Sequence, residues 1–113
     1  MTFTVRIHDL SGDTGENMVE DIGAFATLEE ANLFARRYVR DSVERCRAPG
    51  MGAKAVLDAW FAFGEDATVP EAGELGWRSA TELHDFSERR AEPADRDWRS
   101  LDPRLGEGDE DES

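Results

Sequence analysis

The sequence predicts one α+β domain, in which a small antiparallel sheet packs against one long helix and two shorter helices. Two observations lead to this prediction. Apolar and polar side chains alternate over residues 3–8, which is typical of a strand with one buried face. Residues 27–47 instead repeat their apolar side chains at helical spacing, over a length that suits one face of a small sheet. A chain of 113 residues has room for one domain.

Residues 3–25 are expected to form a β-hairpin. The segment 10–17 is rich in glycine, acidic and hydroxyl residues, which favour a turn. Residues 18–25 would then form the partner strand of the hairpin. The side chains expected on the inner face are Phe3, Val5 and Ile7 from the first strand and Met18, Ile22 and Ala24 from the second.

A long helix is expected over residues 27–47. Thr27 and Glu30 have the spacing of a capping box, in which the hydroxyl accepts the Glu30 amide and the carboxylate reaches back to Thr27. Pro49 and Gly50 end the helix, because proline disfavours helical geometry in the residue before it. The predicted buried stripe comprises Leu28, Ala31, Ala35, Val39, Ser42, Val43 and Cys46, widened by Phe34 and Tyr38.

The far side of this helix is predicted to face solvent. Its polar residues are Glu29, Arg36, Arg37, Arg40 and Glu44. Leu33 is the one large apolar residue among them, and it is a candidate partner contact, although a single exposed leucine is ordinary.

The segment 52–62 fits both a strand and a helix. The apolar residues at 57, 59, 61 and 63 alternate as in a strand, whereas Val56, Trp60 and their neighbours recur at helical spacing. Its four alanines favour a helix, because alanine has the highest helix propensity and an alanine-rich strand buries little. Periodicity leans towards the helix and leaves the strand open.

Three runs in this part of the chain resemble a group of small uncharacterised bacterial proteins of the α+β type. They are Phe25-x-Thr27-x-Glu29-Glu30-Ala31, Pro49-Gly50-Met51 and Phe63-Gly64-Glu65-Asp66, and Trp77-Arg78-Ser79-Ala80 stands where the last helix of that group begins. The resemblance covers residues 2–90 and implies a helix over 52–62; it implies no activity. The chain departs from the group at Gly52, where a capping Ser or Thr is usual, at Ala67, where a Pro is usual, and in the hairpin loop.

Shorter elements are expected after residue 66. A short third strand is predicted at 67–70 and a loop at 71–76. Ser79 and Glu82 have the spacing of a second capping box, and Trp77 just before it is expected to pack on the core. The predicted core comprises Phe3, Val5, Ile7, Ile22, Phe25, Leu28, Ala35, Val39, Leu57, Trp60, Phe61, Leu83 and Phe86.

Residues 91–113 are expected to form a disordered acidic tail after a single domain at 1–90. Their prolines, glycines and acidic residues bury too little apolar surface to offset the entropy of ordering the chain. Trp98 and Leu101 are the exceptions. They are candidate contacts with a partner or with the domain itself.

Charge and composition exclude several classes of function. The formal net charge is −13, and both 1–90 and 91–113 are acidic, so nucleic acid is not an expected partner. A basic protein is the partner that this charge favours. Mimicry of DNA is opposed by the mixed Arg and Glu surface of the long helix, and a homo-oligomer through the outer sheet face stays an open alternative. With one cysteine and neither a signal peptide nor a membrane-length apolar run, a cytoplasmic protein without membrane contact is expected.

The sequence predicts no metal or cofactor. Asp9, Ser11, Asp13 and Glu20 match part of a calcium-loop register, but Thr14 stands where that loop needs glycine. An ordinary acidic turn is therefore favoured. The two histidines, His8 and His84, lack the spacing of a metal site.

No catalytic group is predicted either. Cys46 lies near the C-terminal end of the long helix, where the helix dipole opposes a thiolate, so it is interpreted as a core residue. Glu65 and Asp66 are interpreted as solvated carboxylates of a turn, because nothing around them raises a pKa towards catalytic use.

Two functions follow as hypotheses. The favoured one is a small non-enzymatic interaction or regulatory module, with Trp98, Leu101 and Leu33 as candidate partner contacts. The alternative is a ligand-binding domain or small enzyme with a pocket lined by Trp60, Phe63 and Trp77. The two differ in whether these three aromatic side chains line a cavity or fill the core.

Overall fold

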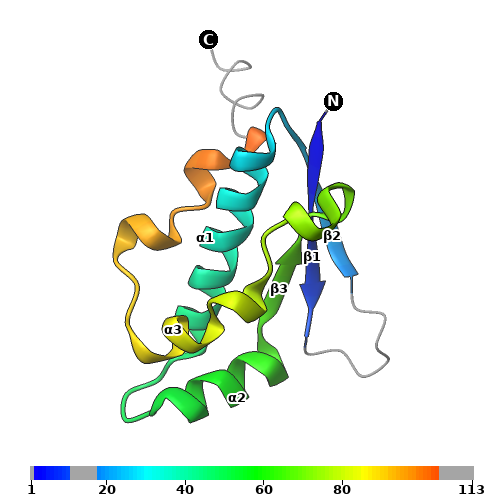
Figure 1. The fold of residues 1–113 in the computed structure, drawn as a ribbon. Helices are drawn as coiled ribbons and strands as arrows, with labels where there is room; N and C mark the ends of the chain where they lie inside the picture. The colour runs from blue at the N-terminus through cyan, green and yellow to red at the C-terminus, as the bar shows by residue number, and fades with distance from the viewer. Residues whose placement is uncertain (1, 11–17, 105–113) are drawn as a thin grey trace.

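The computed structural model describes residues 2–10 and 18–104 of the chain. The long helix α1 (Leu28–Cys46) lies against a three-stranded antiparallel sheet, as Figure 1 shows. The strands are β1 (Phe3–Asp9), β2 (Met18–Phe25) and β3 (Glu65–Thr68), and the shorter helices are α2 (Ala53–Phe63) and α3 (Leu83–Glu88). The predicted α+β class, with a hairpin, one long helix and two shorter ones, is confirmed.

The sheet has the order β2-β1-β3, so the first strand of the hairpin is also the centre of the sheet. Val5 lies opposite Ile22, and Ile7 lies opposite Ala67, and all four side chains are buried. The third strand begins two residues earlier than predicted. The alternation in β1 follows from burial of one face of the strand, since Val5 and Ile7 are buried and their neighbours are only partly so.

The second strand departs from the predicted alternation at its end. Between the pair Val5–Ile22 and the pair Phe3–Phe25, β2 holds one residue more than β1, which is a bulge. Phe25 is consequently turned into the core, and Ala24, predicted on the inner face, is exposed. Most of the hairpin turn, residues 11–17, lies outside the described residues, and so does the greater part of the calcium-loop register.

Helix α1 begins as predicted. The Thr27 hydroxyl oxygen accepts the amide of Glu30 at 3.1 Å. In turn, the hydroxyl lies 3.3 Å from the Glu30 carboxylate, in place of the backbone amide that a full capping box uses. The predicted second box at Ser79 is wrong. A short 3₁₀ turn (Ser79–Thr81) stands there, and the carboxylate of Glu82 binds Arg36 and the indole of Trp77.

The core lies between the sheet, the predicted stripe of α1 and the inner faces of α2 and α3. Ala31, Phe34, Ala35, Val39 and Val43 of that stripe are fully buried. At its two ends, Leu28 and Cys46 are partly buried and packed against the core. Trp60 and Phe61 were both predicted in the core, and Trp60 is buried as predicted, whereas Phe61 is 58% exposed. Adjacent side chains on a helix point about 100° apart, so α2 turns Trp60 inward and leaves Phe61 outside.

Part of the far side of α1, around Arg40, is covered, which the sequence did not predict. Arg40, expected in solvent, is 4% exposed, and its guanidinium stacks 4.6 Å from the centre of the Phe86 ring in α3. Burial lowers the pKa of this guanidinium below its ordinary value. The prediction that Arg40 faces solvent is wrong because α3 and the chain beyond residue 90 pack on this side.

The prediction of disorder is wrong for residues 91–104. The short 3₁₀ turn Pro93–Arg96 lies beside α1 on the side away from the sheet (Figure 1). A second turn, Arg99–Leu101, follows near the start of α1, and Arg104 beyond it lies 2.9 Å from Glu20 of β2. Trp98 and Leu101 are partly buried and pack against the core. Residues 105–113 lie outside the described residues.

Candidate interaction surface

The three aromatic residues predicted to line one pocket lie in three different environments. Trp60 is 1% exposed and belongs to the core. Phe63 lines a cleft beside the C-terminal end of α2, and Trp77 lines another cleft between β3 and the segment 76–80. The structure therefore does not bring these three residues together around one cavity.

Helix α2 has more apolar surface than its packing uses. Its sequence AKAVLDAWFAF contains one Lys and one Asp, and these form an exposed pair at 2.9 Å. Among its side chains Val56 and Trp60 are buried, whereas Phe61 is 58% and Phe63 75% exposed. A helix that is apolar on all sides is normally buried on all sides. The last turn of α2, where the exposed side chains of Phe61 and Phe63 project to different sides of the helix, is named here the α2 face.

A cleft of about 510 Å³ adjoins the α2 face. Its apolar lining comes from Met51, Ala59 and Phe63, and its polar lining from α1 and the strand ends. The residues that line it are Asp9, Ser42, Arg45, Cys46, Met51, Ala59, Phe63, Gly64 and Glu65. This volume lies within the range of small-ligand and peptide pockets.

The polar side of the cleft is organised around Glu65. Its carboxylate accepts the Tyr38 hydroxyl at 2.8 Å and lies 3.5 Å from a guanidinium nitrogen of Arg45. Its amide donates to the Ser42 hydroxyl at 2.9 Å. Arg45 also lies 3.4 Å from Asp41, so this guanidinium is shared between two carboxylates. The carboxylates of Asp41 and Glu65 outnumber the single guanidinium of Arg45 between them, so this edge of the cleft is acidic.

Cys46 at this cleft does not have the environment of a reactive thiol. Burial raises the pKa of the thiol, and the nearby charge of Arg45 offsets this in part. A nucleophilic cysteine needs the thiolate, so a raised pKa disfavours that chemistry. Cys46 is partly buried against the core.

Tyr38 supplies a direct test of this corner of the structure, because it is the single tyrosine of the chain. Burial, and next the hydrogen bond to Glu65, raise its pKa above the ordinary value of 10.0. The folded state thus favours the neutral phenol. Its contribution to stability is complete below pH 10 and is lost as the pH rises above that value. We expect tyrosinate absorbance to develop near pH 10 in denaturant and at clearly higher pH in the folded protein.

The variant Glu65→Gln separates the two causes. It removes the charge beside the phenol, and the Tyr38 pKa should fall part of the way while burial still holds it above 10. A folded wild-type protein whose tyrosinate absorbance rises at pH 10 would contradict the buried position of Tyr38.

The second cleft, of about 450 Å³, lies between β3 and the segment 76–80. Trp77, Val69 and Pro70 provide apolar walls, and Asp66 and Arg78 carry opposite charges. The indole nitrogen of Trp77 does not face a ligand, since it donates to Glu82 at 2.7 Å. The cleft lining is completed by Thr68, Gly73, Gly76, Ser79 and Ala80.

The predicted partner contacts also differ in their environment. Leu33 is 38% exposed on α1, as expected for the far side of that helix. Trp98 and Leu101 pack on their own domain, and the indole nitrogen of Trp98 donates to Asp41 at 3.1 Å. Asp41 was not singled out from the sequence. In the sequence, nothing marks Asp41 except its position between Arg40 and Ser42 on the long helix. In the structure it is 8% exposed.

The two histidines lie apart from any cluster of metal-ligating side chains in the described part of the chain. The described part of the chain contains no group of three or more His, Cys, Asp and Glu side chains that could hold a metal ion. The imidazole of His8 lies 3.0 Å from the Thr68 hydroxyl, and His84 lies 3.2 Å from Glu88 on the exposed side of α3. Over residues 2–10 and 18–104, none of the helices combines the length and hydropathy needed to span a membrane.

Comparisons with protein-family models, with curated proteins and with solved structures found no significant match to this chain. The resemblance to the small bacterial α+β group therefore stays a prediction. The arguments about function that follow depend on the geometry of this chain alone.

Proposed function

We propose that this protein is a small interaction module that binds a protein partner through the α2 face and the adjoining cleft. The observation that supports this most is the pair of exposed phenylalanines, Phe61 and Phe63, on a helix with no charged residue besides Lys54 and Asp58. Phe63 lines the adjoining cleft, and Phe61 is exposed in the same helical turn. Large apolar side chains exposed beside a cleft are typical of a binding surface, because a monomer gains nothing from keeping them in water.

The partner we propose has apolar residues flanked by basic ones. The apolar residues would occupy the cleft beside Phe63 and Met51, and the basic residues would approach Asp9 and Glu65 at its edge. The net charge of −13 favours such a partner at a distance as well, since it steers cations towards the protein. Binding is therefore expected to weaken as salt screens these charges.

The double variant Phe61→Ser, Phe63→Ser tests this proposal. A photo-crosslinking residue at Ala62, between the two phenylalanines, should capture a discrete partner from cells, and the double variant should abolish the capture. Each phenylalanine is expected to contribute about 1–3 kcal/mol to binding when it is buried by the partner. The partner, once identified, should bind the purified wild-type protein with an affinity that falls between low and high salt.

Leu75→Ser provides the matched control. Leu75 is 74% exposed in the 3₁₀ turn Pro70–Leu75, away from α2, so its loss lowers exposed apolar surface without touching the α2 face. If Leu75→Ser reduces capture as much as the double variant does, general stickiness explains the result and the proposal is wrong.

A specific observation also favours a second candidate, a ligand site in the cleft beside Trp77. Opposite charges at Asp66 and Arg78 across apolar walls would suit a small zwitterionic or polar molecule. A ligand screen by thermal shift, repeated with Arg78→Gln, tests this candidate. Stabilisation by a ligand that persists in Arg78→Gln would place the ligand elsewhere.

A further inference from the structure

Residues 91–104 are attached to the rest of the domain by side chains and not by main-chain pairing. Within the described residues, their main-chain hydrogen bonds to other main-chain groups close turns inside the segment, such as Asp95 to Glu92 and Leu101 to Trp98. The capping box of Glu92 and Asp95 is also internal. The segment thus satisfies much of its own main-chain hydrogen bonding. It packs on α1 mainly through side chains.

One buried carboxylate on α1 holds the centre of this segment. Arg96 donates to Asp41 Oδ1 from Nε at 2.8 Å and lies 2.7 Å from it through Nη2. The Trp98 indole nitrogen donates to Asp41 Oδ2 at 3.1 Å. Both carboxylate oxygens of Asp41 therefore bind the segment, through two side chains that stand two residues apart.

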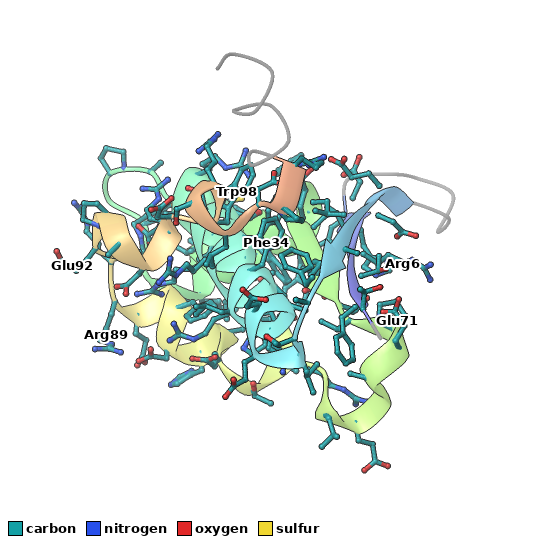
Figure 2. All side chains as sticks on the ribbon, turned by 90° about the horizontal axis from the view of Figure 1, so that it is seen from above. Arg6, Phe34, Glu71, Arg89, Glu92 and Trp98 are labelled. Carbon is teal, nitrogen blue, oxygen red and sulfur yellow. The ribbon has the colours of Figure 1, made fainter. Side chains whose placement is uncertain are left out.

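Aromatic contacts complete the attachment. The ring of Trp98 lies 4.9 Å from that of Tyr38 and 5.7 Å from that of Phe34, measured between centroids. Figure 2 shows Trp98 beside Phe34 on the top of the molecule. Arg37 of α1 donates to the main-chain oxygen of Asp97, between the two anchors, at 3.0 Å.

These groups select a particular chemistry. A carboxylate whose two oxygens can both accept takes a guanidinium and an indole N–H together, and an aromatic wall takes the indole ring. Arg45 of α1 also lies 3.4 Å from Asp41 Oδ2. A lysine would lose the planar geometry of the guanidinium, and a phenylalanine would lose the N–H donor. The spacing of the two anchors then limits the ligand to an extended or turn segment with the pattern Arg-x-Trp.

We propose that the α1 surface formed by Phe34, Arg37, Tyr38 and Asp41, named here the α1 socket, is a peptide-binding site for Arg-x-Trp segments. In this structure Arg96-Asp97-Trp98 of the same chain occupies it. Phe34 is fully buried and Asp41 8% exposed while it does so. A partner with an Arg-x-Trp segment binds the α1 socket by displacing residues 91–104, so the segment acts as an internal competitor. This site is separate from the α2 face and does not depend on the function proposed there.

Peptide exchange in the full-length protein tests the proposal. A specific protease site is inserted after Arg90, in the exposed connection between α3 and the segment. After cleavage, a fluorescent peptide of residues 91–104 is added and its anisotropy is followed. We expect saturable binding to the cleaved protein, with far-UV circular dichroism unchanged. The uncleaved chain should bind the peptide at least about a hundredfold more weakly, because its tethered segment has a millimolar effective concentration.

Variant peptides provide the specificity test without altering the protein. Arg96→Gln and Trp98→Ala should each weaken binding by roughly tenfold or more, since each removes a hydrogen bond to a charged and buried group. Ser100→Ala is the control peptide and should bind as the unaltered peptide does, because Ser100 is exposed and bonds within the segment. In the protein, Asp41→Asn should weaken binding of the unaltered peptide by a similar factor.

Three results would overturn the proposal that the α1 socket is a peptide-binding site. If the cleaved protein loses its secondary structure, or if the peptide never exchanges into it, residues 91–104 are an integral part of the domain and not a ligand of it. If all peptides bind equally, the contact has no Arg-x-Trp specificity. Peptide binding that survives in the double variant Phe61→Ser, Phe63→Ser would show that the two sites are independent, whatever the outcome for the α2 face.

Discussion

Phe34→Ala is expected to lower the free energy of unfolding by about 3–5 kcal/mol, the range for a buried phenylalanine truncated to alanine. Phe34 is fully buried, and its ring contacts three other rings, at 5.1 Å from Phe25, 5.9 Å from Tyr38 and 5.7 Å from Trp98. The cavity would open between Phe25 at the end of β2, Tyr38 of α1 and Trp98 of the segment 91–104. Because domains of this size are stable by about 5–15 kcal/mol, the variant should unfold at much lower urea concentration.

The neighbouring residue supplies the control. Leu33 stands one position earlier on α1 and is 38% exposed, so Leu33→Ala should cost less than about 1 kcal/mol. Urea denaturation of both variants measures the difference. Equal losses for Leu33→Ala and Phe34→Ala would mean that α1 is rotated about its axis relative to the structure described.

Gly64→Ala is the second substitution for which a large effect is expected. Gly64 is buried at the end of α2, and an added Cβ would overlap Trp60 Cδ1 and lie 2.8 Å from the Trp60 main-chain oxygen. Trp60 is itself 1% exposed and has little room to move. Overpacking of this kind typically costs about 1–3 kcal/mol, and here the backbone must also shift, so we expect the upper end of that range.

Gly52→Ala is the matched control for this prediction. Gly52 precedes the same helix, and nothing lies within 4 Å of the position of an added Cβ. Its expected cost is about 0.5–1 kcal/mol, because alanine is a weaker N-cap than glycine. Thermal denaturation of the two variants compares them, and a Gly64→Ala protein as stable as Gly52→Ala would contradict the close approach of Trp60 to the chain at residue 64.

Several features of the fold could be predicted because they depend on neighbours in the sequence. Thr27 caps α1 as predicted, since the donor it serves is three residues away. The stripe from Ala31 to Val43 is buried because one face of a long helix must meet the apolar face of the sheet, wherever that sheet lies. The alternation in β1 likewise identifies its buried face without knowledge of its partners.

The candidate sites were predicted less well, because their residues depend on distant contacts. Trp60 and Phe61 are adjacent and both suit a helical apolar face, and the placement of α2 against α1 and α3 decides that Trp60 is the buried one. Asp41 and Trp98 are 57 residues apart in sequence, and neither shows from its neighbours that it binds the other. The acidic composition of 91–104 does not reveal this packing, to which Arg96 and Trp98 contribute by binding one carboxylate and two aromatic rings on α1.

The amino-acid sequence by itself determined the class of the fold, the hairpin and the buried stripe of the long helix, because these depend on propensity, capping and periodicity within a few residues. Only the tertiary structure decided that α2 leaves Phe61 and Phe63 in water and that residues 91–104 close over Phe34. The physical reason is that local patterns state which side chains are apolar, whereas burial depends on which surfaces meet. In a chain this small there are fewer inner surfaces than apolar faces, and the faces left over are the candidate sites of binding.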